Sequence, residues 1–230
     1  MKKITLSLMI ISLVSIIPVC QSGIQINKNK FIYIEKNNNE KIEIKNNSDD
    51  AYFIQSSVKL ANTENDDVSP FMISPPIFKL SANETFFLDI IKIDDITDNE
   101  KESLYKINIK SIPIVNGKNE NILHISLNMI YNLIYRPKSL EPIADDLYYK
   151  VDILRNNDNE LIIHNPTPYY LTITSIKNKD KVIFDKTKRL PPFGKYNTKT
   201  KIRDINTLSY SIKNEHEVII DAPSKKIINE

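Results

Sequence analysis

The sequence predicts an all-β protein made of two β-sandwich domains. Three observations support this prediction: short runs rich in Ile, Phe and Tyr recur along the chain, helical periodicity is scarce, and clusters of Asn, Asp, Ser and Pro separate the runs. The pattern is interrupted within residues 136–142, which contain two prolines, and then resumes. We therefore expect one sandwich on each side of this interruption.

The first half of the chain contains about seven strand-like runs within about 110 residues, a density typical of a β-sandwich. These strands are expected at residues 24–26, 31–34, 41–45, 52–60, 85–93, 104–112 and 122–135. The second half contains a smaller set, with a short helical turn expected at residues 145–150. Its strands are expected at residues 151–154, 161–164, 169–176, 181–184, 207–212 and 218–220.

The first 22 residues have the pattern of a secretory signal peptide. Lys2 and Lys3 precede an apolar run over residues 4–19, and Cys20-Gln21-Ser22 places small residues at a cleavage site. The apolar run is too short to span a bilayer comfortably. Lipidation at Cys20 is a weaker alternative, because bulky Val19 precedes the cysteine. We predict a signal peptide at residues 1–22, an N-terminal domain at 23–140 and a C-terminal domain at 141–230.

Composition argues against several classes of function. Removing Lys2 and Lys3 with the leader lowers Lys+Arg from 31 to 29, which equals the 29 Asp and Glu, so a basic nucleic-acid-binding surface is not expected. The leader also contains the single cysteine. His124, His164 and His216 lack metal-ligand spacing, and the three glycines form no phosphate-binding loop. We therefore expect no enzyme activity, no cofactor, no metal and no small-molecule substrate.

The most distinctive segment is the long strand expected at residues 122–135. Its centre alternates apolar and polar side chains, so that one face carries an apolar ladder. Such a ladder is typical of a half-buried core strand, and equally of a strand offered to the sheet of another protein. Alternation alone does not separate these two interpretations. The ladder consists of Leu123, Ile125, Leu127 and Met129.

Several segments, in order along the chain, resemble the periplasmic pilus-assembly chaperones of the chaperone–usher pathway. The matching segments are QINKNKFIY at 25–33, SPPIFKL at 74–80, ESLYKINIKSIP at 102–113, LIYRP at 133–137 and NPTPYYLT at 165–172. The resemblance implies two immunoglobulin-like β-sandwich domains in an L or boomerang shape. The short, cysteine-free spacer at residues 114–121 resembles the short-loop branch of this family.

The resemblance also implies a function. Family members in the periplasm bind fimbrial subunits that lack a strand, donate their own strand to the open groove, and deliver the subunit to an outer-membrane usher. In this chain the donated side chains would be Leu123, Ile125 and Leu127, with Met129 as a fourth. An exposed strand edge of this kind can also pair with a second copy of the chain, so the sequence does not decide whether the unbound protein self-associates.

The family anchors the terminal carboxylate of the subunit with two basic residues, which correspond here to Lys30 and Asn132. Lys30 keeps the charge but lacks the two-pronged geometry of the usual arginine. Asn132, where lysine is expected, can donate a hydrogen bond but carries no charge. Lys30 could act alone, or a neighbouring lysine could substitute.

The family's interdomain ionic cluster corresponds here to Arg136 and Glu102. Its third member falls near Asn214, with Glu215 adjacent, and the sequence does not decide between them. This cluster is expected to fix the angle between the domains. Two alternatives to an ordinary chaperone remain: a secreted two-domain adhesin or surface subunit, and a specialised chaperone with altered carboxylate anchoring.

Overall fold

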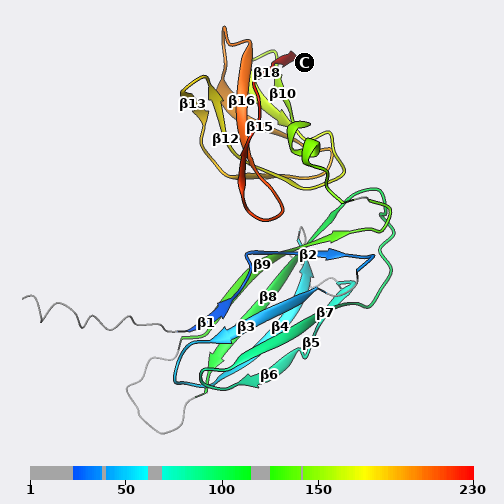
Figure 1. Ribbon diagram of the computed structural model, residues 1–230, viewed down its shortest axis with the longest axis vertical. Coiled ribbons are helices and arrows are strands. Elements are labelled where there is room, and N and C mark those ends of the chain that lie inside the picture. The colour runs from blue at the N-terminus through cyan, green and yellow to red at the C-terminus, as the bar shows by residue number, and fades with distance from the viewer. Residues whose placement is uncertain (1–22, 38–39, 62–68, 115–124, 141) are drawn as a thin grey trace, which may run out of the picture.

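The computed structural model describes residues 23–37, 40–61, 69–114, 125–140 and 142–230. The predicted signal peptide lies outside these ranges. Figure 1 shows two separate β-sandwiches, the second placed over one end of the first. Among the residues described, no helix is long and apolar enough to cross a membrane.

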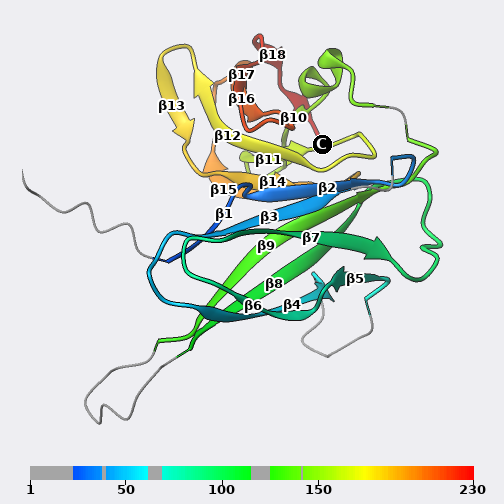
Figure 2. The same ribbon diagram turned by 60° about the horizontal axis from the view of Figure 1, so that its bottom comes forward.

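The N-terminal domain packs a four-stranded sheet, in the order β1-β3-β7-β5, against a five-stranded sheet, in the order β2-β9-β8-β4-β6. Figure 2 shows β8 and β9 running side by side through this domain. The strand bounds are β1 Ile24–Ile26, β2 Lys30–Ile34, β3 Lys41–Asn46, β4 Tyr52–Leu60, β5 Phe71–Ser74, β6 Ile77–Leu80, β7 Thr85–Lys92, β8 Ser103–Pro113 and β9 Leu127–Arg136.

The core of this domain follows directly from the alternation in the sequence. Every second residue of a strand points to the same face, so each strand contributes one row of side chains to the space between the sheets. Phe31 and Tyr33 of β2 and Ile107 and Ile109 of β8 are fully buried there. The residues that alternate with them, such as Lys106 before Ile107, lie on the opposite face of the sheet.

The C-terminal domain begins with a 3₁₀ turn, η1, and contains two further sheets. One sheet has the order β15-β11-β10-β19, and the other the order β13-β12-β16-β17, with β14 paired to β12 and β18 to β16. The bounds are η1 Asp145–Tyr149, β10 Asp152–Arg155, β11 Glu160–His164, β12 Leu171–Asn178, β13 Lys181–Phe184, β14 Lys188–Leu190, β15 Lys195–Lys201, β16 Thr207–Lys213, β17 Ile219–Asp221, β18 Lys225–Lys226 and β19 Ile228–Asn229.

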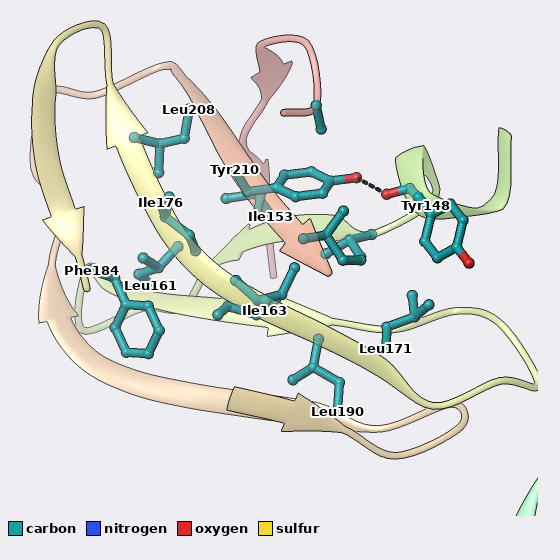
Figure 3. Close-up of a cluster of buried hydrophobic side chains, with 14 of the residues drawn as sticks. Tyr148, Ile153, Leu161, Ile163, Leu171, Ile176, Phe184, Leu190, Leu208 and Tyr210 are labelled. Atoms are coloured by element: carbon teal, nitrogen blue, oxygen red, sulfur yellow. Dashed lines mark hydrogen bonds between the residues drawn. The ribbon is translucent and has the colours of Figure 1, made fainter. Parts of the chain in front are cut away.

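Figure 3 shows the core of the C-terminal domain, which is aliphatic with a few aromatic rings. Its one drawn hydrogen bond runs from the buried Tyr210 hydroxyl to the Tyr148 backbone carbonyl, at 3.0 Å. The bond fastens η1 to β16, because a buried hydroxyl without a partner would be costly. The segment that enters the domain is thereby fixed to its core.

The all-β prediction is confirmed, and the predicted strands appear within a few residues of the expected positions. The sequence did not reveal β5 and β6, where prolines flank short apolar runs, or β14 and β15, whose lysines and threonines weaken the apolar signal. β18 and β19 were also missed, because each has only two residues. The predicted strand at residues 122–135 is observed as β9, Leu127–Arg136.

Candidate functional site

β9 is paired on both sides along only part of its length. β8 pairs with β9 from Leu127 to Tyr135, whereas β2 pairs with it only from Asn132 to Arg136. In the part of the chain that the structure describes, no strand lies beside Leu127–Tyr131 on the β2 side. This stretch, the free edge of β9, therefore offers unpaired backbone groups to another strand.

The ladder face of β9 changes from exposed to buried along the strand. Leu127, the first residue of β9, is 53% exposed, Met129 is half-buried against the core, and Leu133 and Tyr135 are fully buried. Ile125, which was expected inside the strand, precedes β9 by two residues and is 59% exposed. One face of one strand thus belongs to the core at one end and to the surface at the other. Leu123, the first residue of the predicted ladder, lies outside the described residues.

The expected carboxylate anchors, Lys30 and Asn132, lie directly opposite each other on β2 and β9. Asn132 is also directly opposite Lys106 of β8, whose ammonium donates to the Asn132 side-chain oxygen at 2.6 Å. Residues opposite one another across a sheet point to the same face, so these three side chains form one row. We call Lys30, Asn132 and Lys106 the cation row. It begins where the free edge ends.

The Lys30 ammonium is occupied by a carboxylate of the C-terminal domain. The Glu217 carboxylate lies 3.1 Å from Lys30 and 3.1 Å from Lys213, and these contacts hold the pKa of Glu217 below its usual value although burial opposes them. Asn214 shapes the loop that presents Glu217, because its side-chain oxygen accepts backbone N–H groups of His216 and Val218. The site therefore already binds one carboxylate, supplied by the protein itself.

The predicted ionic cluster lies between the domains. The Arg136 guanidinium donates two hydrogen bonds to one Glu102 oxygen, at 2.8 and 2.7 Å, and both side chains are buried. The second Glu102 oxygen accepts the Tyr170 backbone N–H at 2.7 Å. Arg136 also donates to Glu215, which is therefore the third member of the cluster.

Glu102 links the two domains through its backbone as well as its side chain. Its N–H donates to the carbonyl oxygen of Pro168 at 2.9 Å. Burial raises the pKa of the Glu102 carboxyl, and the Arg136 charge and the Tyr170 N–H act in the opposite direction. The carboxylate thus depends on donors from both domains to remain charged inside the protein.

Comparison with known proteins identifies the family. The model of the N-terminal domain of PapD, described as a pili and flagellar-assembly chaperone, matches residues 23–141, and the model of the C-terminal domain of the pili-assembly chaperone PapD matches residues 146–216. The chain belongs to the PapD family of pilus-assembly chaperones. Membership confirms the predicted resemblance and favours the chaperone over the adhesin alternative.

Individual relatives agree with the family assignment. The chaperone protein FocC of Escherichia coli is 32% identical over 186 residues, covering 78% of each chain. The chaperone protein FimC of E. coli K12 is 28% identical over 203 residues, covering 85% of this chain and 81% of FimC. Among solved structures, the periplasmic chaperone SfaE matches with a TM-score of 0.69 and 25% identity, covering 90% of this chain and all of SfaE.

A further structure confirms the PapD-like fold. The Salmonella enterica SafB chaperone, solved in complex with the SafA pilin, matches with a TM-score of 0.71 and 22% identity, covering 88% of this chain and 94% of the solved chain.

Two residues near the contact between the domains were not predicted from the sequence. Lys106 stands within the ESLYKIN segment, where nothing in the local pattern separates it from an exposed strand lysine. Glu217 lies in a turn between two strands and comes to Lys30 only through the packing of the domains. Strand pairing places Lys106 beside Asn132, and the packing of the domains places Glu217 beside Lys30, so both positions depend on contacts between residues far apart in the sequence.

Proposed function

We propose that this pilus-assembly chaperone binds fimbrial subunits in the periplasm by adding the free edge of β9 to them as a strand, and delivers them to an outer-membrane usher. The observation that supports this most strongly is the exposed ladder on an edge that has no partner strand among the described residues. Leu127 at the start of β9 and Ile125 just before it are more than half exposed, although the face of β9 that carries Leu127 forms core further along. The structurally similar SafB chaperone forms a complex with a pilin, SafA, which supports a subunit as the partner.

The physical basis is that each of two incomplete sheets supplies the partners that the other lacks. An immunoglobulin-like subunit that lacks a strand exposes both apolar core and unpaired backbone N–H and C=O groups, which are costly to leave unpartnered. The free edge of β9 can supply the backbone partners, and the ladder can supply the apolar side chains. Fully burying an aliphatic side chain contributes about 1.5–3 kcal/mol before entropic costs.

The cation row determines which way the added strand runs. A strand placed beside the free edge meets β2 at Asn132, so it must end near Lys30 and Lys106. A strand parallel to β9 brings its terminal carboxylate to these cations, whereas an antiparallel strand would bring a chain end of the opposite polarity. Charge complementarity therefore favours a parallel strand that ends in a carboxylate. Lys30 and Asn132 would anchor that carboxylate.

Release does not require a nucleotide in this scheme. The sequence contains no phosphate-binding glycine loop, and a competing strand can replace β9 because it offers the same backbone partners. At the usher, the strand of the next subunit would provide this replacement. Arg136 and Glu102 would keep the cleft open at a fixed angle while the subunit is held.

Affinity purification from the native host tests the proposal. The protein would carry a tag at its C-terminus, be isolated from the periplasmic fraction, and have its co-purifying proteins identified by mass spectrometry. We expect a small fimbrial subunit in equal amount. A protein that purifies alone, from cells shown to express fimbrial subunits, would contradict the proposal. Its absence from the periplasmic fraction would contradict the proposed location.

A further inference from the structure

The cation row contains two lysines, and they differ in how their charge is balanced. Lys30 is neutralised by Glu217 at 3.1 Å. Lys106 forms no ion pair with a carboxylate among the described residues, and its ammonium instead donates to the neutral Asn132 oxygen at 2.6 Å. A half-buried ammonium that faces an amide and no carboxylate would be stabilised by a bound anion.

A second cation increases this imbalance. Arg189 of β14, from the other domain, lies close enough for its charge to act on Lys106. Burial and, after it, this positive charge lower the pKa of the Lys106 ammonium. Within the described part of the structure, the buried Nε of Arg189 has no hydrogen-bond partner. The two domains thus bring two cations together here, and the carboxylate whose charge acts on Arg189, Glu217, is already paired with Lys30.

We propose that Lys106 provides the second positive charge of the carboxylate site, in place of a cation at Asn132. This inference rests on the proposed function and identifies how the site holds its ligand. The occupant is the terminal carboxylate of a β-strand added beside the free edge of β9. Asn132 positions Lys106 through its side-chain oxygen, which leaves its amide N–H groups available to donate to the same carboxylate.

The register of the sheet makes this arrangement feasible. Neighbouring strands lie about 4.8 Å apart, so the backbones carrying Lys30 and Lys106 are separated by roughly 10 Å with Asn132 between them. Lysine side chains are long enough to converge over the central residue from both sides. Moving the charge from β9 to β8 thus keeps two cations on one carboxylate while the residue between them becomes neutral.

The test uses the subunit that co-purifies with the wild-type protein. A synthetic peptide that copies its final strand would be prepared as the free acid and as the C-terminal amide, and the affinity of each would be measured. Because hydrogen bonds to a charged group are stronger than those to a neutral one, we expect the wild-type protein to prefer the acid by about ten- to hundredfold. Lys106→Gln should remove most of this preference while leaving the affinity for the amide unchanged.

Two further variants separate a direct role from a structural one. Lys59 lies directly opposite Lys106 on β4, one strand further from the free edge. Lys59→Gln removes the same charge, and we expect this variant to keep the preference for the acid. Adding Asn132→Lys to Lys106→Gln should restore the preference, since it returns a cation to the row. Lys106→Gln with the full acid preference would overturn the inference while leaving the proposed function intact. A wild-type protein that retains no subunit would overturn both.

Discussion

Replacing Ile125 and Leu127 together by alanine should weaken subunit binding while leaving the chaperone folded. Both side chains are more than half exposed in the unbound protein, at 59% and 53%, so their truncation removes little of the core. Full burial of such a side chain contributes about 1.5–3 kcal/mol, and binding would bury the exposed half. We therefore expect a loss of about 0.8–1.5 kcal/mol per residue, or roughly 15- to 150-fold for the pair.

Ile77 provides a matched control for this experiment. It is 62% exposed and lies on β6, at the opposite edge of the same sheet. Ile77→Ala removes a similar apolar surface and should retain the subunit as the wild-type protein does. Aspartate at Ile125 and Leu127 should abolish retention, because a charge would have to enter an apolar groove.

The assay is quantitative recovery of the co-purifying subunit, with thermal unfolding of each variant as the test of folding. A correctly folded double variant that keeps the wild-type affinity would refute the assignment of this edge as the binding strand. Equal losses for the Ile77 variant would show instead that exposed apolar surface in general, and not the free edge of β9, retains the subunit.

Three other predictions concern charged groups. Arg136→Ala should lower the free energy of unfolding by about 3 kcal/mol, because it leaves buried Glu102 without its main partner, and chemical denaturation would measure this. Glu217→Gln should strengthen binding of the free-acid peptide by up to about fivefold, since it releases Lys30; unchanged affinity would show that Glu217 does not compete with the ligand. The Lys92 ammonium, 2.6 Å from the Glu35 carboxylate, is the main cause that lowers the pKa of Glu35 to about 2. The stability that the Glu35–Lys92 pair provides should therefore be fully present above about pH 4.5 and be lost as the pH falls toward 2. Glu35→Gln should flatten the stability profile in that range, and an unchanged profile would contradict the role of this pair.

Much of the architecture was predictable from the sequence because strand patterns are local. Alternation in residues such as Ile107 and Ile109 identifies both the strand and its buried face without reference to any other segment. The Arg136–Glu102 pair was expected only through the family resemblance, and the same comparison left its third member between Asn214 and Glu215. The structure places Glu215 there.

The cation row could not be predicted in the same way. Lys30, Lys106 and Asn132 are far apart in the sequence and become neighbours only through the register of three strands. A shift of one residue in either pairing would turn one member of the row to the opposite face. The exposure of Leu127 likewise depends on where β2 begins, which the sequence of β9 does not contain.

The way β9 is held also has a mechanical consequence. Its hydrogen bonds to β8 run perpendicular to the strand axis, and β2 grips its far end from the other side. A force along the axis of β9 therefore acts on many of these hydrogen bonds at once, in shear. A force directed away from the free edge would instead break the hydrogen bonds of an added strand one after another. A competing strand could therefore displace a subunit from the free edge one hydrogen bond at a time, with little force. A force applied to the subunit along the strand axis would not extract β9 from the chaperone.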